Sequence, residues 1–184
     1  MSKRDLVENE YYHIYSRGVL KNNLFLCHDD YLRFMCLIKI SNNKNCDLLC
    51  RILKDKSYEE ILEENNINSD FVEILTGVLM PNHFHILIKA KGKNLTGKFM
   101  HKVLTGYAMY FNRKYSKIGH TFERKYQFRH IKNDSDLKNV IHYIKMNPLK
   151  LIMNDYSHKK LMYGEIKLTK KQKKFIEKYP YKLG

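Results

Sequence analysis

The sequence lacks any long apolar run. No stretch of 18 consecutive apolar residues occurs in the 184-residue chain, so no transmembrane helix is predicted. The opening residues MSKRDLVENEYY carry too many charged and polar side chains for a secretory signal peptide. We therefore expect a cytoplasmic protein with no membrane partner.

Acidic residues are also scarce. There are 19 Asp and Glu against 34 Lys and Arg, which gives a formal net charge of +15. Such an excess predicts an anionic partner. Nucleic acid is favoured, because cations that neutralise phosphates release condensed counterions and so provide affinity for any sequence. A membrane surface is the weaker alternative, since the chain offers no obvious anchor.

Cysteine is sparse and poorly arranged for metal binding. The four cysteines, Cys27, Cys36, Cys46 and Cys50, lie in the first third of the chain and include one CxxxC pair. Without a second pair or nearby histidines, this pattern does not predict a zinc site. Reduced, buried thiols are the expected state.

The hydrophobic pattern predicts alternating strands and helices within one domain. Expected strands cover residues 11–19, 71–80, 83–90 and 121–131. Expected helices cover residues 28–41, about 58–65, 95–115 and 134–147, and a basic tail follows. This order predicts an α+β fold, with a central antiparallel sheet and helices packed mainly on one face.

The stretch MPNHFHILI places two histidines on a predicted strand. Because strand side chains alternate, His83 and His85 share one face, while Phe84 lies on the other with the apolar residues that follow. The two histidines are then roughly 6 to 7 Å apart, close enough to hold one cation. Half-exposed sheet histidines are equally consistent with this pattern, so both interpretations stay open.

The segment DLKNVIHYIKMNP predicts a helix that ends near Pro148. Tyr143 and Asn147 lie one turn apart on its flank. By spacing alone, Tyr143 is most simply a packing residue and Asn147 a residue that ends a helix.

Three segments together resemble a known family. MPNHFHILI, YFNRKYSKIGHTFERKYQFRHI and VIHYIKMNPLK are similar to the single-tyrosine HUH transposases, particularly the REP-associated tyrosine transposases. The resemblance runs from about residue 11 to residue 150. It implies a ferredoxin-like or RRM-like HUH domain over residues 1–150, with a helical insertion at about 44–69 and a basic extension over 151–184.

The resemblance also implies an activity and its residues. His83 and His85 match the metal-binding histidines, Tyr143 the nucleophile and Asn147 the third metal ligand. The expected metal is Mg²⁺ or Mn²⁺, of which Mn²⁺ suits imidazole ligands better. The implied reaction cleaves single-stranded DNA near hairpins through a 5′-phosphotyrosine intermediate and transfers the strand. A monomer and a homodimer are both compatible with the sequence.

Basic side chains on the predicted helix and strand offer contacts to the DNA backbone. The candidates are Lys98, Lys102, Arg113, Lys114, Arg124, Lys125 and Arg129. Tyr126 or Phe128 could stack on bases. A solvated basic face explains each residue equally well.

Two other functions are also consistent with the sequence. The protein could be a noncatalytic nucleic-acid-binding module, or another HUH nuclease such as a replication initiator.

Overall fold

The fold is built on one five-stranded sheet, seen here in a computed structural model that describes residues 6–45, 48–64, 69–153, 156–162 and 166–183. The strands are β1 (Tyr11–Arg17), β2 (Val72–Met80), β3 (His83–Ala90), β4 (Gln127–His130) and β5 (Lys182–Leu183). Their order across the sheet is β4-β1-β3-β2-β5, and every neighbouring pair is antiparallel.

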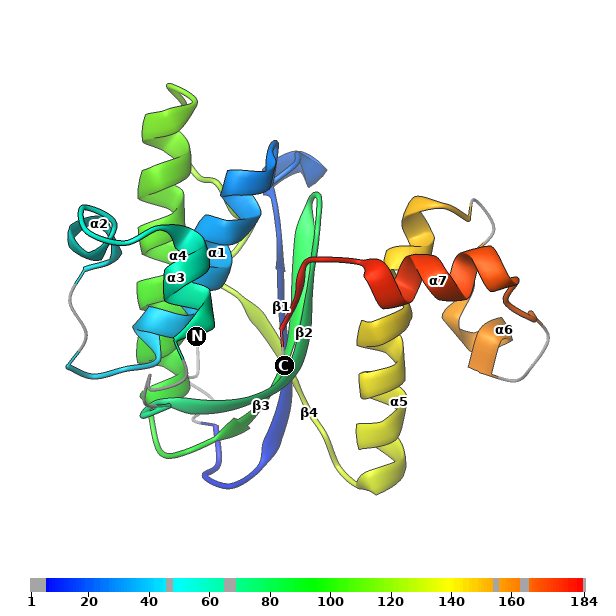
Figure 1. The fold of residues 1–184 in the computed structure, drawn as a ribbon. Helices are drawn as coiled ribbons and strands as arrows, with labels where there is room; N and C mark the ends of the chain where they lie inside the picture. Colours follow the sequence, from blue (N-terminus) through cyan, green and yellow to red (C-terminus); the bar gives the residue numbers. More distant parts are fainter. Residues whose placement is uncertain (1–5, 46–47, 65–68, 154–155, 163–165, 184) are drawn as a thin grey trace.

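The helices form a layer on each side of this sheet (Figure 1). The first layer contains α1 (His28–Ser41), α2 (Leu49–Ile52), α3 (Tyr58–Glu63) and α4 (Leu95–Lys114). The second contains α5 (Asp134–Met146), α6 (His158–Met162) and α7 (Lys170–Lys178). Two 3₁₀ turns, η1 (Val19–Lys21) and η2 (Asn147–Leu151), complete the described elements.

Side-chain alternation along β3 divides the core in two. Phe84, Ile86 and Ile88 belong to the larger apolar cluster, which α1 and α4 cover, and Leu87 belongs to the smaller one beneath α5 and α7. The expected α+β class and antiparallel sheet are confirmed. Helices cover both faces, with the larger core beneath the first layer.

The tight turn between β2 and β3 is anchored by backbone hydrogen bonds. The amides of Leu24 and Phe25 both donate to the Pro81 carbonyl, at 2.7 and 3.1 Å, and the Gly18 amide donates to the Asn82 carbonyl at 2.9 Å. The predicted hairpin around Pro81 and Asn82 is confirmed. The loop after β1 therefore fixes the start of β3, where the histidine pair lies.

One element prediction differs from the structure. The strand expected over 121–131 forms its ladder only at β4, and Phe122 makes an isolated bridge to Gly18. No helix or strand was assigned within the basic tail from the sequence, and the structure forms α7 and β5 there. Thr169 and Gln172 form a capping box that begins α7. Of the proposed insertion, residues 46–47 and 65–68 lie outside the described residues.

The cysteine prediction was correct only in part. Cys36 is a buried free thiol, and burial raises its pKa to about 12. Cys27 and Cys50 are free but exposed, so the expectation that these two are buried was wrong. Cys46 lies outside the described residues.

The buried carboxylate of Asp30 links α1 to α4. It has no exposed side-chain surface and accepts hydrogen bonds from Tyr110, Lys114 and Tyr115 at 2.9, 2.8 and 2.7 Å. The Leu26 amide donates to it at 2.8 Å. Burial alone would raise the pKa of this carboxyl, but the hydrogen bonds outweigh burial and lower the pKa to about 2.

We expect Asp30 to make folding stability depend on acid pH. Because its folded pKa lies below the ordinary value of 3.8 for an aspartate, its stabilisation is complete above that pH. It is lost as the pH falls to about 2. A shift of this size corresponds to about 2 kcal/mol of unfolding free energy. Urea unfolding of wild type and Asp30→Asn from pH 6 to pH 2 measures it.

The exposed neighbour Asp29 provides the matched control. Asp29→Asn should keep the pH dependence of the wild type, whereas Asp30→Asn should be less stable at pH 6 and lose less stability on acidification. Identical pH profiles for wild type and Asp30→Asn would contradict the assigned role of the network.

Candidate active site

The pairing of β1 with β3 gathers three histidines on the face beneath α5. In this register Tyr15 lies opposite His85, and Arg17 lies opposite His83. His13 points to the same side of the sheet, and its Nε2 lies 3.0 Å from Nδ1 of His85. His13 and His85 are both buried, and the ring centroids of His83 and His85 are 5.0 Å apart.

Neighbouring groups orient both rings of the β3 pair. The Asn82 Nδ2 donates to the Lys21 carbonyl, so its Oδ1 faces His83 and accepts from His83 Nδ1 at 2.6 Å. His83 Nε2 then carries no proton. One of the two nitrogens in the contact between His85 Nδ1 and His13 Nε2 carries the proton. In the tautomer in which His85 Nδ1 donates, His85 Nε2 is unprotonated. Hydrogen bonds of this kind fix ring orientation and tautomer in metal-binding histidines.

The three imidazoles are held in their neutral forms. Burial lowers the pKa of His83 to about 4, with Lys150 adding to the effect and Asn147 opposing it. Burial and the neighbouring Arg129 lower the pKa of His13 to about 4 as well. Burial, and then the neighbouring His13 and His83, hold the pKa of His85 well below its usual range. Neutral imidazole is the form that binds a metal ion.

Helix α5 crosses above the histidines and brings Tyr143 against them. The Tyr143 ring lies edge-on to His85, with the centroids 5.2 Å apart, and the side chain is half-buried, as expected from its place on the helix flank. Helix α5 starts at the side-chain cap Asn133 and ends at Met146. Val140 and Ile144 are buried against the sheet and so set which side of the helix faces the histidines.

Tyr143 and the histidine pair line one pocket of ≈ 320 Å³. Its other lining residues are Tyr15, Ser16, Arg17, Glu123, Arg124, Gln127 and Lys150. Fully buried Asn147 begins η2 directly after α5. The structure therefore gathers Tyr143, His83 and His85 at one site within a single chain and places Asn147 one helical turn beyond Tyr143.

The polar atoms at this site suit a divalent cation. Nε2 of His85 and both amide atoms of Asn147 are buried without a hydrogen-bond partner, and such atoms cost roughly 1 to 3 kcal/mol each. Coordination by His85 Nε2 and Asn147 Oδ1 would satisfy two of them. Across the described residues, no three His, Cys, Asp or Glu side chains are arranged to hold a metal ion. A third ligand to the histidine pair would therefore be of another type, and the unpaired Asn147 amide oxygen is one candidate.

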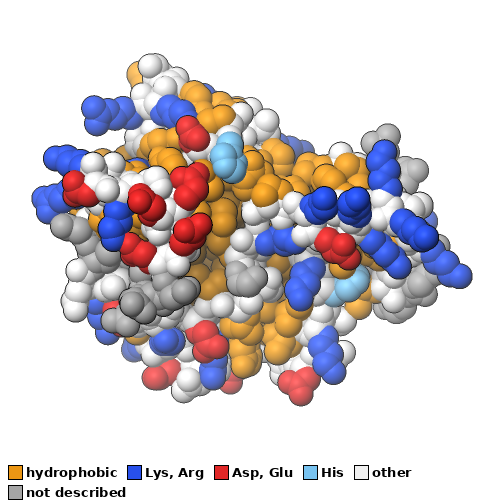
Figure 2. Space-filling view, viewed as in Figure 1, with side chains coloured by type: hydrophobic (Ala, Val, Ile, Leu, Met, Phe, Trp, Pro, Cys, Tyr) orange, Lys and Arg blue, Asp and Glu red, His pale blue; other side chains and the backbone are white. Residues whose placement is uncertain are grey.

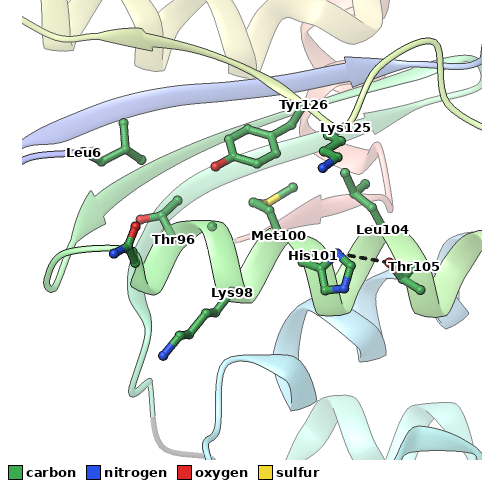
Figure 3. Close-up of a pocket in the computed structure, with 11 residues that line it drawn as sticks. Leu6, Thr96, Lys98, Met100, His101, Leu104, Thr105, Lys125 and Tyr126 are labelled. Carbon is green, nitrogen blue, oxygen red and sulfur yellow. Dashed lines mark hydrogen bonds between the residues drawn. The ribbon is translucent and has the colours of Figure 1, made fainter. Parts of the chain in front are cut away.

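A larger pocket of ≈ 740 Å³ lies against α4 (Figure 3). Helix α4 belongs to the layer on the opposite side of the sheet from α5 (Figure 1). The apolar side chains of Leu6, Met100 and Leu104 line the pocket together with Tyr126, and Lys98 and Lys125 lie at its edge. Two of the predicted DNA contacts and one predicted stacking residue are therefore brought together here.

The other predicted DNA contacts are dispersed. Lys114 pairs with buried Asp30, and Arg129 pairs with Asp136 through two bonds of 2.9 Å. These two cations are partly neutralised within the protein, which makes them weaker candidates. Lys102 lies over the Phe71 ring, Arg113 is exposed on α4, and Arg124 lines the histidine pocket.

Sequence reasoning missed three residues of the site. Asn82 stands beside the histidines in MPNHFH, and its amide could have been considered as a partner for His83. His13 alternates with aromatic residues on the first strand, but no sequence signal pairs that strand with the HFH strand. Lys150 follows the NP pair, and its Nζ lies 3.3 Å from the Tyr143 hydroxyl.

Within the described part of the chain, no helix has both the length and the hydropathy needed to cross a bilayer. A solved structure of a REP-associated tyrosine transposase bound to a REP hairpin matches this fold with a TM-score of 0.51 at 14% identity. The match covers 82% of this chain and 73% of that one. No curated protein matches the sequence.

The family comparison covers the elements that form the site. The model of the IS200-like transposase family matches residues 34–147, from within α1 to the first residue of η2. This segment is more than half of the 184-residue chain and contains the histidine pair, Tyr143 and Asn147. The chain therefore belongs to the IS200-like transposase family.

Proposed function

We propose that this protein is a metal-dependent endonuclease and strand transferase that acts on single-stranded DNA near hairpins. The observation that carries the proposal is the pocket shared by Tyr143, His83 and His85. In this pocket Tyr143, the proposed nucleophile, lies beside two neutral imidazoles that could bind a metal ion through their Nε2 atoms. The solved REP-associated transposase was bound to a hairpin, and the same substrate class is proposed for this chain.

The residues have distinct roles in this proposal. His83, His85 and Asn147 would hold a Mg²⁺ or Mn²⁺ ion, and both metals accept a mixed nitrogen and oxygen ligand set. The bound ion would polarise a nonbridging oxygen of the scissile phosphate. Tyr143 attacks the phosphorus and displaces the 3′ oxygen, which leaves a 5′-phosphotyrosine and a free 3′-hydroxyl. The covalent bond retains phosphoester energy, so rejoining needs no nucleotide triphosphate.

The basic surface would hold the DNA backbone on both sides of the sheet. Arg124 reaches the histidine pocket and is placed to contact phosphate there. Lys98 and Lys125, around the pocket that holds Tyr126, are placed to bind an unpaired nucleotide by charge and stacking. Lysines also gather over α7, whereas acidic side chains gather around α3 (Figure 2). The lysines over α7 would therefore add phosphate contacts on the side of the sheet that carries the proposed active site.

We expect Tyr143→Phe to abolish covalent attachment to DNA while leaving hairpin binding within about threefold of wild type, because binding depends mainly on the basic surface. The measurement is denaturing electrophoresis of 3′-labelled hairpin DNA incubated with protein and Mn²⁺. Tyr11→Phe, on the same face of the sheet, should retain the wild-type yield. If Tyr143→Phe forms the covalent DNA adduct at the wild-type level, Tyr143 is not the nucleophile. If the wild-type protein itself forms no adduct, a noncatalytic binding protein is favoured.

We expect His13 to act through His85 on metal affinity. His13→Ala should weaken Mn²⁺ binding by about 10- to 100-fold, because His85 loses the acceptor that fixes its tautomer. His13→Gln should recover part of the loss, since its side-chain oxygen can accept the same hydrogen bond. Electron paramagnetic resonance titration of free Mn²⁺ measures both. Exposed His120→Ala is the control, and unchanged affinity in His13→Ala would contradict the role.

We expect the nucleophile and the metal ligands of one active site to come from the same chain, because Tyr143 packs against His85 of its own chain. Mixing Tyr143→Phe protein with a His83→Ala/His85→Ala variant should then leave cleavage at background. Restored cleavage in the mixture would instead require a homodimer whose active sites combine residues of both chains.

A further inference from the structure

Lys150 is the side chain whose placement the proposed mechanism leaves unexplained. Its Nζ donates a hydrogen bond of 3.3 Å to the Tyr143 hydroxyl and lies 5.1 Å from the centre of the Tyr143 ring. It lines the same pocket as His83 and His85. The Lys150 ammonium therefore touches the attacking oxygen and faces the space where the scissile phosphate would lie.

The turn that follows α5 brings the Lys150 side chain back to Tyr143. Residues seven apart lie about two turns, or 11 Å, apart along a continuous helix. Here α5 gives way to η2, in which Pro148 is at the start of the turn and Pro148 and Leu149 are buried. The buried turn fixes the backbone of Lys150, while the Lys150 side chain is exposed.

Other charged and basic groups near Tyr143 do not make the same contact. Arg17 and Arg124 line the pocket, but among the described residues only Lys150 gives the Tyr143 hydroxyl a cationic hydrogen-bond donor. His158 contacts the ring edge-on, with the centroids 5.0 Å apart, rather than the oxygen. Lys150 is therefore the cation best placed to act on the reacting atoms.

We propose that Lys150 is a catalytic residue, which holds the Tyr143 oxygen in line with the scissile phosphorus and neutralises charge on the phosphoryl group as the bond forms. This inference rests on the proposed function. In the step, the bond between Tyr143 Oη and phosphorus forms and the bond between phosphorus and the 3′ oxygen breaks. The phenol proton passes to water, and the departing 3′ oxygen takes a proton from water. Lys150 keeps its own protons and acts by charge and hydrogen bonding.

The test compares the rate of covalent adduct formation with DNA affinity in single-turnover reactions of the full chain. Lys150→Met should slow adduct formation by about 10²- to 10³-fold, the usual loss for one preorganised donor at a developing oxyanion. Affinity for the uncleaved hairpin should change by less than about tenfold, because at most one phosphate contact is removed. Lys150→Arg should regain at least tenfold of the lost rate, since it restores a charged donor.

A chemical rescue separates charge from packing within one folded protein. Lys150→Cys treated with 2-bromoethylamine acquires an ammonium group at nearly the lysine position, and treatment with iodoacetamide adds a neutral group. Wild type treated in parallel accounts for alkylation of the four native cysteines. Lys145→Met, which removes an exposed charge from α5, should behave as wild type.

Rescue by the ammonium reagent alone supports the proposal. An adduct rate for Lys150→Met within threefold of wild type overturns it, as does equal recovery with the neutral reagent. Both outcomes leave the proposed function intact, because Tyr143→Phe still tests the nucleophile. Failure of wild type to form any adduct would refute the proposed function instead.

Discussion

The antiparallel pairing of β1 with β3 is the constraint on which the site depends. A shift of one residue in this register would turn His13 away from His85, because neighbouring strand side chains face opposite sides of the sheet. The observed register joins the two rings at 3.0 Å, leaving Nε2 of His85 directed away from that hydrogen bond. The turn at Pro81 and Asn82, anchored by the loop after β1, fixes the start of β3 in the same register.

The opposite face of β3 maintains this arrangement. Phe84 and Ile86 are fully buried beneath the first helical layer, so the strand cannot rotate without exposing large apolar side chains. The buried carboxylate of Asp30 links α1 and α4 within that layer. Packing on one face therefore directs the histidines to the other, where α5 covers them.

The end of α5 gives the site its second half. Met146 ends the helix, and the buried Asn147–Pro148 turn follows at once. Tyr143 thereby projects from regular helix, while Lys150 returns from η2 to its hydroxyl. The Tyr143 hydroxyl and the Lys150 cation are brought to one pocket by a change in helical geometry over a few residues. The amide atoms of Asn147 are buried without a hydrogen-bond partner, so they lower the folding stability unless a ligand contacts them.

The sequence by itself determined the α+β class, the strand–turn–strand around MPNHFH and the sharing of one strand face by His83 and His85, because these follow from local periodicity and turn chemistry. Its resemblance to single-tyrosine transposases also pointed to Tyr143 and Asn147, and family membership is now shown. Only the tertiary structure decided that His13 contacts His85, that Lys150 contacts Tyr143 and that Lys114 is paired with buried Asp30. It also decided that the tail adds α7 and β5 to the fold. Strand order, register and the path of the chain after a helix depend on contacts between distant segments, which no local pattern encodes.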